Sequence, residues 1–235
     1  GYHRSSEDGR FRLDAEVIKR FFRCDREREG SGSPLPSFLR EVAQMTIHPI
    51  RFTGRPTGET DRLPQEIACY DLLDQLGVSY DRVDHTAAHT IADCAVIEKV
   101  LGAPICKNLV LCNRQKTSFY LLLMEGEKPF RTKELSKQIG SARLSFASPE
   151  DMEAYLHVTP GSATILALMF DRGHRVQLIL DRPVAEWVRI GCHPCINTST
   201  LNLSMAEIRN KFLPYLGVEP ILVELPEERE EVNAA

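Results

Sequence analysis

Two strongly apolar runs, NLVLCN and SFYLLLM, lie one after the other near the middle of the chain, separated only by the polar segment RQKT. Each run has the length of a strand and is rich in the branched and aromatic residues that pack well on a pleated surface. Two such runs joined by a short polar segment predict neighbouring buried strands. The core of this protein is therefore expected to include a sheet.

Helical and strand-like patterns surround this pair, from residue 63 to residue 225. Apolar residues at helical spacing predict helices at 63–77, 90–102, 131–140, 148–156 and 204–217. Shorter apolar runs predict further strands at 78–83, 163–170, 175–180, 186–191, 198–204 and 220–225. Strands outnumber helices and several adjoin directly, which favours an α/β domain on a mixed sheet over a doubly wound parallel one.

Side-chain caps are expected at the starts of four helices. Thr90, Thr132 and Ser148 stand at positions where a hydroxyl can accept the unpaired backbone N–H groups of the first turn. Ser204 and Glu207 have the spacing of a capping box.

The first 62 residues differ from the regular region that follows. They contain two polar stretches bearing Gly and Pro, DREREGSGSPLPS and RFTGRPTGET, and two short segments with helical spacing that could not build a core alone. We expect an N-terminal extension over 1–62, poorly structured or partly helical, a folded domain over 63–225, and an acidic, disordered tail over 226–235.

Composition narrows the class of protein. No stretch reaches the roughly 18 uninterrupted apolar residues of a membrane span, and the first thirty residues are too charged for a secretory signal. The formal net charge of −4 gives no overall attraction to DNA or to a membrane, although nine Lys or Arg against three Glu between Lys99 and Arg143 favour a local basic surface. Seven cysteines without regular spacing indicate a reducing compartment. We expect a cytoplasmic protein that binds neither membranes nor DNA.

The segment GCHPCINTST, residues 191–200, places Cys192 and Cys195 on either side of His193. A structural zinc site needs four ligands, and the chain has no second Cys/His pair of matching spacing. A redox dithiol is expected at the start of a helix, whereas a polar, strand-like segment follows here. Neither chemistry is favoured, and we expect no metal and no other cofactor.

Other familiar catalytic patterns are missing from the sequence. It has no glycine-rich phosphate loop and no serine in a G-x-S-x-G context. The segment PGSAT at 160–164 is typical of a turn, or of a loop whose backbone N–H groups hold a carbonyl oxygen. Lys107 lies at the entrance of an apolar strand, where a lysine is usually solvated. His85, His89 and His157 are lone histidines, interpreted most simply as partly buried and hydrogen-bonded.

Five segments taken together resemble the YbaK/prolyl-tRNA synthetase-associated editing domain family, and within it the free-standing prolyl-tRNA editing proteins. Each segment alone is weak, but their order and spacing from Leu63 to Leu225 make chance similarity improbable. They are KNLVLCN followed by SFYLLLM, then LSFASPEDMEAYLHVTPGSAT, RVQLILD, HPCINTSTLNLS and GVEPILVEL. The resemblance implies a mixed, mostly antiparallel and partly barrel-like sheet flanked by helices.

The resemblance also implies an activity and a site. The expected reaction is hydrolysis of mischarged tRNA(Pro), with alanyl-tRNA(Pro) as the leading substrate, by a protein acting in trans without a metal or a covalent nucleophile. The expected partners are the acceptor end of tRNA(Pro) and prolyl-tRNA synthetase. Lys107, Gly161 and His193 match the catalytic positions of the family. The expected substrate-binding residues are Asn108, Ser162, Ala163, Pro194, Asn197 and Thr198.

The chemistry of an ester is consistent with this site. An aminoacyl ester is already activated, so a positioned water and a stabilised oxyanion can suffice without a strong base. Lys107 is expected to bind the terminal phosphate or the carbonyl oxygen, and the backbone from Gly161 to Ala163 is expected to bind the ester carbonyl. His193 is expected to orient water or the ribose, whose neighbouring hydroxyl shuttles the proton.

Three alternatives stay open. The substrate could be another ester such as cysteinyl-tRNA(Pro). The chain could instead be a catalytically silent domain that only binds tRNA or a synthetase. A zinc-binding module is the most distant alternative.

Selectivity against proline requires steric exclusion, for which Ile91, Leu101 and Val110 are candidates. The sequence also departs from the family after Gly161, where Ile165 stands in a segment that commonly contains proline.

Overall fold

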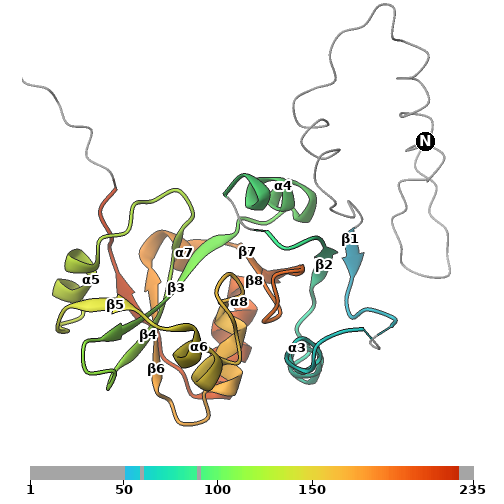
Figure 1. The fold of residues 1–235 in the computed structure, drawn as a ribbon. Coiled ribbons are helices and arrows are strands. Elements are labelled where there is room, and N and C mark those ends of the chain that lie inside the picture. Colours follow the sequence, from blue (N-terminus) through green and yellow to red (C-terminus); the bar gives the residue numbers. More distant parts are fainter. Residues whose placement is uncertain (1–50, 59–60, 89–90, 228–235) are drawn as a thin grey trace, which may run out of the picture.

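The structure is a computed structural model that describes residues 51–58, 61–88 and 91–227, excepting the side chains of residues 91 and 92. The expected cap Thr90, His89 and most of the expected extension and tail lie outside these residues. The described part forms two sheets with helices packed against them (Figure 1). No helix in it is long and apolar enough to cross a membrane.

The first sheet, sheet A, has four antiparallel strands in the order β1-β2-β8-β7. Its strands are β1 (Arg51–Thr53), β2 (Asp81–Asp84), β7 (Arg189–Cys192) and β8 (Ser199–Ser204). The edge strand β1 precedes residue 63, so the sheet takes in part of the segment expected as an extension. The expected strand at 78–83 begins later, at Asp81.

The second sheet, sheet B, has five strands in the order β5-β3-β4-β6-β9. Its strands are β3 (Cys106–Asn113), β4 (Phe119–Glu125), β5 (Leu144–Phe146), β6 (Val176–Asp181) and β9 (Ile221–Val223). The pair β3 and β4 forms the predicted antiparallel hairpin, with Val110 opposite Leu121. β6 and β9 continue the sheet in parallel with β4.

A single parallel bridge joins the two sheets. Ile105, just before β3, pairs with Gly191 on β7, and the N–H of Gly191 donates to the carbonyl of Pro104 at 2.7 Å. A Cβ at Gly191 would lie 2.7 Å from Cγ1 of Ile105, so no larger residue fits there without movement. Within the described residues the sheets meet at this edge without closing a barrel. The expected mixed, mostly antiparallel sheet is confirmed.

The helices largely follow the predicted pattern. They are α3 (Pro64–Gln75), α4 (Ile91–Leu101), α5 (Thr132–Gln138), α6 (Pro149–Leu156) and α7 (Arg182–Glu186), followed by the C-terminal segment α8 (Met205–Glu207), η2 (Ile208–Phe212) and α9 (Leu213–Leu216). Ser148 caps α6 in a capping box with Asp151, as the sequence predicts for Ser148. Thr132 does not cap α5, because it is already the first helical residue.

The C-terminal segment is not a uniform α-helix. Ser204 accepts the N–H of Glu207 at 3.4 Å at its start, and residues 208–212 then form a π-helical turn. Pro214 lies just beyond this turn and has no N–H to donate to the preceding turn, so the regular bonding pattern is interrupted there.

The prediction of a strand at 163–170 is wrong. Residues Ile165–Phe170 form a 3₁₀ helix, η1, whose first turn is capped by the hydroxyl of Thr164. Most of the segment is buried, and a short, fully buried apolar run has no periodicity that separates a strand from a helix. The expected strand at 186–191 is likewise only partly correct, because it begins at Arg189 after the short helix α7.

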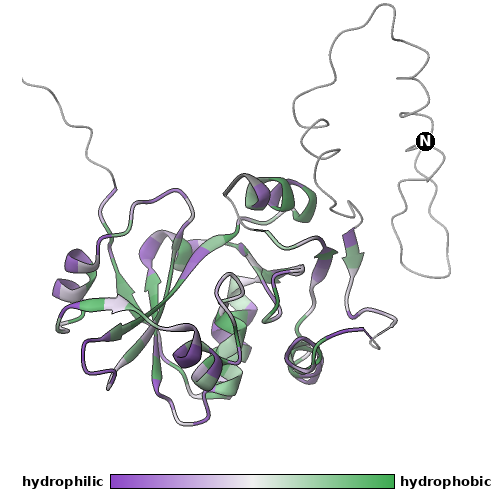
Figure 2. Cartoon of the chain, viewed as in Figure 1, coloured by the Kyte–Doolittle hydropathy of each residue, from purple (hydrophilic) through white to green (hydrophobic). Residues whose placement is uncertain are grey.

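Three apolar clusters lie around the sheets. The largest fills one face of sheet B and reaches α3, η1, the C-terminal helical segment and sheet A. A second cluster lies on the opposite face of sheet B under α5 and includes Leu111, Leu122 and Leu135. A third lies between α4 and β2 and includes Val83 and Ile97. Figure 2 shows hydrophobic residues along the central strands and mostly hydrophilic ones on α5 and α6.

Candidate functional site

His193 lies at the start of the loop that joins β7 to β8, two residues after the bridge between the sheets. Its Nδ1 is 2.9 Å from the carbonyl oxygen of Ser199 and 3.2 Å from the hydroxyl of Thr200. A carbonyl oxygen can only accept, so Nδ1 carries the ring proton and donates it. The other ring nitrogen, Nε2, then has a free lone pair, and no described residue bonds to it.

His85 extends this arrangement from the end of β2. Its Nδ1 lies 2.7 Å from the carbonyl of Thr86 and therefore donates, which leaves its Nε2 as an acceptor for the hydroxyl of Thr200 at 2.8 Å. The hydrogen bonds thus run in one direction, from His193 to Thr200 and on to His85. The carbonyl of Ser199 fixes the tautomer of His193, and the bonds through Thr200 to His85 agree with it.

Both imidazoles are held neutral. Burial lowers the pKa of His193 to about 4, against the opposing effect of its bond to Ser199, and the nearby ring of His85 lowers it further. Burial also lowers the pKa of His85, more than its bond to Thr86 raises it. At neutral pH, Nε2 of His193 can therefore accept a hydrogen bond from water or from a ribose hydroxyl.

Partly buried ion pairs hold β2 next to α3, just before His85. Arg62 bonds to Glu66 and to Asp84, and Asp84 also accepts from Arg82. Burial alone would raise the pKa of Asp84, but the bonds from both arginines lower it below its usual value. Each charge has a partner, so the network fixes the strand that carries His85.

Gly161 and Asn197 form a second part of the site. Asn197 joins two loops, since its side chain accepts the N–H of Ala88 at 3.1 Å and donates to the carbonyl of Ala88 at 2.7 Å. Gly161 has a φ of +91°, and a Cβ there would lie 3.1 Å from Nδ2 of Asn197. Both the backbone conformation and the space favour glycine at this position.

The loop around Gly161 presents backbone donors. The N–H of Ser162 bonds to the carbonyl of Thr159 at 3.0 Å, and the hydroxyl of Ser162 bonds to the backbone of the same residue. The N–H groups of Gly161 and Ala163 have no acceptor within the described part of the chain. Two such donors flanking a fixed turn can hold a carbonyl oxygen or an oxyanion. Ser162 therefore has a structural role in this loop and is not placed as a nucleophile.

Lys107 lies beside this cluster without bonding to it. The parallel bridge between Ile105 and Gly191 puts Lys107 and His193 each two residues further along their strands. The ammonium of Lys107 donates to the carbonyl of Lys128 at 2.9 Å, which leaves two of its three N–H groups without a partner among the described residues. No carboxylate pairs with Lys107 there, so its charge is available to an anion.

The remaining expected residues lie around these groups. Asn108 donates to the carbonyl of Cys106 at 3.0 Å, and its buried Oδ1 has no partner in the described chain. Pro194 is buried. Thr198 is exposed, and its carbonyl accepts the N–H of His85 at 2.9 Å. The structure thus brings the Gly161 loop next to the 193–198 loop where Gly161 approaches Asn197, with Lys107 and Asn108 at the adjoining end of β3.

The cysteines flanking His193 are buried in the largest core cluster. The Sγ of Cys195 lies 3.5 Å from that of Cys69, and burial raises the pKa of Cys192 and Cys195 well above the usual value. Buried thiols of raised pKa are poor nucleophiles and poor metal ligands. Within the described residues, no three His, Cys, Asp or Glu side chains are grouped as a metal site.

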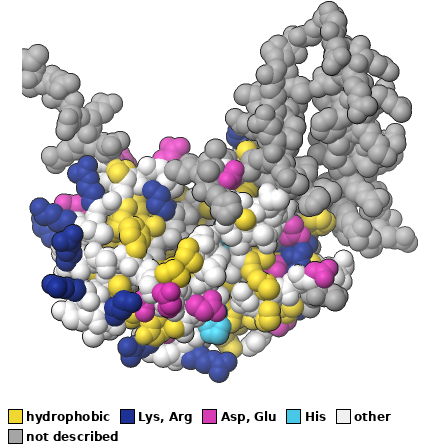
Figure 3. Space-filling view, viewed as in Figure 1, with side chains coloured by type: hydrophobic (Ala, Val, Ile, Leu, Met, Phe, Trp, Pro, Cys, Tyr) yellow, Lys and Arg dark blue, Asp and Glu magenta, His cyan; other side chains and the backbone are white. Residues whose placement is uncertain are grey.

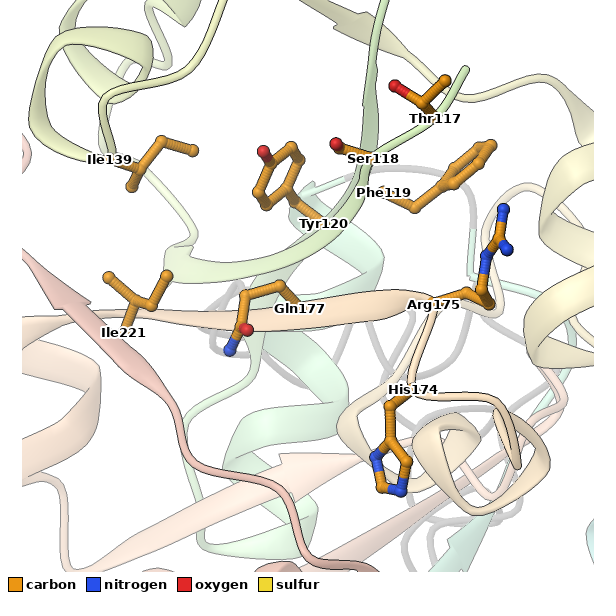
Figure 4. A pocket seen from close by; sticks show the side chains of 9 residues that line it. All are labelled: Thr117, Ser118, Phe119, Tyr120, Ile139, His174, Arg175, Gln177 and Ile221. Carbon is orange, nitrogen blue, oxygen red and sulfur yellow. The ribbon is translucent and has the colours of Figure 1, made fainter.

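Two open grooves lie elsewhere on the protein. One, of about 700 Å³, is lined by residues such as Tyr120, Ile139 and Arg175, whose side chains Figure 4 shows. Tyr120 lies on β4, Arg175 just before β6, and Ile139 at the C-terminal end of α5. The other, of about 750 Å³, adjoins it through His174 and Gln177. Neither groove is lined by an expected site residue. Of the expected lining residues, Leu101 and Val110 are buried in different core clusters, and the side chain of Ile91 lies outside the described set.

His85 and Thr200 are the residues of this site that sequence reasoning missed as functional. His85 was expected only as a buried, hydrogen-bonded histidine, which it is. No local pattern connects it with His193, because the two are 108 positions apart in the sequence and meet only through the pairing of β2 with β8.

Comparison with known proteins gives a family and a fold. The model of the aminoacyl-tRNA editing domain family matches residues 85–211, more than half of the chain. The prolyl-tRNA editing protein ProX of Acetoanaerobium sticklandii is 28% identical over 136 residues, which cover 58% of this chain and 83% of that protein. The prolyl-tRNA synthetase associated domain-containing protein 1 of Xenopus laevis is 32% identical over 165 residues, covering 68% and 96% respectively.

Two solved structures share the fold. A crystal structure described as a candidate trans-editing enzyme for prolyl-tRNA synthetase superposes with a TM-score of 0.52 at 16% identity, over 71% of this chain and 99% of that one. A hypothetical protein, APE2540, gives a TM-score of 0.52 at 14% identity, over 68% and 97%. The matched range 85–211 contains His85, Lys107, Gly161 and His193.

Proposed function

Since the chain belongs to the aminoacyl-tRNA editing domain family, we propose that it hydrolyses mischarged tRNA(Pro) in trans, with alanyl-tRNA(Pro) as its substrate. Its family and its relatives make it an aminoacyl-tRNA deacylase. The observation that carries the finer proposal is the Nε2 of a neutral His193, which the bonds to Ser199 and Thr200 leave without a partner among the described residues. Beside it lies a loop in which the N–H groups of Gly161 and Ala163 have no acceptor among those residues.

His193 orients the attacking water in this proposal. Its neutral Nε2 accepts a hydrogen bond from water or from the ribose hydroxyl next to the ester. Water adds to the ester carbonyl carbon, the bond from that carbon to the ribose oxygen breaks, and the ribose oxygen takes up the proton that water loses. The neighbouring ribose hydroxyl shuttles that proton, and the products are the free amino acid and uncharged tRNA.

The loop at Gly161 stabilises the oxyanion. The N–H groups of Gly161 and Ala163 bind the ester oxygen as it gains negative charge, and the fixed turn means that they need little reorganisation. Asn197 and Ser162 keep the loop in place. A donor of this kind contributes about 10²–10³-fold to the rate in other hydrolases.

Lys107 supplies the positive charge of the site. With no carboxylate partner among the described residues, its ammonium binds the terminal phosphate of the tRNA or the ester carbonyl oxygen. Asn108, the next residue on β3, adds a substrate contact in this proposal through its Oδ1, a buried atom with no partner among the described residues. Pro194 and Thr198 complete the wall next to His193. No metal and no covalent nucleophile take part in this mechanism.

The substrate and its partners follow from the same proposal. An apolar pocket gains little from preferring alanine to proline, so proline is excluded by a steric clash. The partners are the acceptor end of tRNA(Pro) and prolyl-tRNA synthetase, in the cytoplasm. Residues 63–225 form the editing unit, to which the extension adds the edge strand β1 (Arg51–Thr53), and an acidic tail follows. Cysteinyl-tRNA(Pro) is the alternative substrate, and a silent tRNA-binding or synthetase-binding domain is the alternative function.

A deacylation assay tests this proposal. Alanyl-, cysteinyl- and prolyl-tRNA(Pro) are compared as substrates of the wild-type protein and of Lys107→Ala, with spontaneous hydrolysis in buffer as the baseline. We expect the alanyl ester to be hydrolysed fastest, and Lys107→Ala to lose about 10²-fold in rate. If the wild-type protein hydrolyses every ester only at the baseline rate, it is not a deacylase of these substrates. A fully active Lys107→Ala rules out the role of Lys107 but leaves the function standing.

A further inference from the structure

A basic surface lies on the side of sheet B that α5 covers. Between residues 126 and 146 the chain has five Lys or Arg and two Glu. Lys128 is buried and paired with Asp181 at 2.8 Å. The other four are exposed and have no ion-pair partner in the described part of the chain: Arg131, Lys133, Lys137 and Arg143. Figure 3 shows Lys and Arg side chains gathered at the edge that α5 and β5 occupy.

An exposed aromatic ring lies within this surface. Phe146, the last residue of the edge strand β5, keeps 63% of its area exposed. Its ring packs edge-on against Phe130, with the ring centres 6.1 Å apart, and Phe130 belongs to the apolar cluster under α5. The ring is therefore held from one side and open on the other. We call Arg131, Lys133, Lys137, Arg143 and Phe146 the α5–β5 surface.

The α5–β5 surface is close to the proposed active site. Phe146 pairs with Leu111 on β3, and Leu111 and Lys107 lie on the same face of that strand because side chains alternate. Four residues of a strand span about 13 Å. Lys107 also bonds to Lys128, which lies three residues before Arg131. A strand of nucleic acid that ends at Lys107 therefore reaches Phe146 and α5 within a few nucleotides.

We propose that the α5–β5 surface binds the RNA strand that leads away from the ester of the bound aminoacyl-tRNA. The four cations contact backbone phosphates, and Phe146 stacks on an unpaired base. An aromatic ring beside spaced cations suits single-stranded RNA, because every base offers a face for stacking while the phosphates repeat along the strand. The identity of the RNA rests on the proposed function.

Variants of the surface test this inference in the full-length protein. Lys133→Gln/Lys137→Gln removes two cations, and Phe146→Ser removes the ring. The matched control is Arg172→Gln/Arg209→Gln, which removes two exposed arginines from the loop after η1 and from η2. The probes are uncharged tRNA(Pro) for affinity, alanyl-tRNA(Pro) for hydrolysis, and the alanyl ester of adenosine, which is too short to reach the surface.

We expect both surface variants to bind tRNA(Pro) about tenfold more weakly than the wild type and the control. The logarithm of the tRNA-binding constant decreases linearly with the logarithm of the salt concentration. The magnitude of this slope should be smaller by about 1.4–1.8 in the double lysine variant, as expected for the loss of two phosphate contacts. KM for alanyl-tRNA(Pro) should rise in parallel, while kcat and the hydrolysis of alanyl-adenosine stay unchanged.

Three results overturn the inference. In the first, both surface variants bind tRNA(Pro) as tightly as the wild type. In the second, the control variant loses as much tRNA affinity as the surface variants. In the third, the surface variants lose binding to phosphatidylserine vesicles but keep their tRNA binding. Failure of the proposed function has a different signature, because the wild type would then hydrolyse neither ester. Its tRNA affinity would still report on the surface.

Discussion

The imidazoles of His85 and His193 hydrogen-bond to one hydroxyl group, that of Thr200, at 2.8 and 3.2 Å. Their rings lie 5.9 Å apart between centroids, and burial favours the neutral form of both. The two residues come from different loops of sheet A, so the geometry of His193 depends on the pairing of β2 with β8. We therefore propose that Thr200 and His85 position the ring of His193.

Replacing His193 should remove most of the hydrolytic activity. We expect His193→Ala to lower kcat on alanyl-tRNA(Pro) by about 10²-fold, since it deletes the group that orients water in the proposed mechanism. Cys192→Ser and Cys195→Ser are the matched controls in the same segment. They should lose stability, because each puts a hydroxyl in an apolar core, but nearly keep kcat per folded molecule. Equal losses in all three variants would contradict the assignment.

Thr200→Val tests the hydrogen-bond chain itself. Valine keeps the shape of threonine but leaves His85 without its donor, while His193 keeps its bond to Ser199. We expect kcat to fall about tenfold and KM to change by less than about twofold, because the ring of His193 is less firmly held. Steady-state kinetics measure both constants. Thr57→Val, at an exposed position outside the site, should match the wild type, and wild-type kcat in Thr200→Val would refute the role of Thr200.

Gly161→Ala should affect both stability and activity. The new Cβ meets a positive φ and lies 3.1 Å from Nδ2 of Asn197, so the loop must shift. Gly77→Ala is a matched control, because Gly77 has a φ of +59° with nothing within 4 Å of a Cβ. We expect both variants to lose about 1–2 kcal/mol in urea unfolding. Only Gly161→Ala should also lose hydrolysis, and equal activity in the two would remove the loop from the mechanism.

Stability should fall as the pH is lowered through the range of the histidines. The pKa of His193 is about 4 in the folded protein and 6.5 when unperturbed, so the unfolded chain binds more protons between these values. The free energy of unfolding should therefore drop by about 2 kcal/mol from pH 7 to pH 5, and His85 adds to the drop. Urea unfolding at both pH values measures it. His193→Asn should show a smaller drop in the free energy of unfolding between these pH values. If the variant shows the same drop as the wild type, His193 is not buried as a neutral group.

Local patterns of the sequence determined much of the fold. The hairpin of β3 and β4, the capping of α6 by Ser148 and the helical spacing of α3 depend on residues a few positions apart, so they can be read from the chain directly. The family resemblance singled out Gly161 and His193 because their motifs are also local. The strand predicted over 163–170 is wrong, because burial of most of this run erases the periodicity that distinguishes a strand from a 3₁₀ helix.

The tertiary structure alone decided how the candidate site is assembled. Gly161 approaches Asn197, and His85 reaches Thr200 and His193, only because the sheets bring together loops that are far apart in the sequence. The tautomer of His193 and its lowered pKa likewise depend on burial and on which acceptors lie nearby. The same holds for the N–H groups of Gly161 and Ala163, which have no acceptor among the described residues. The sequence therefore determined which residues the chain offers for chemistry, and the pairing of distant strands determined their geometry and protonation.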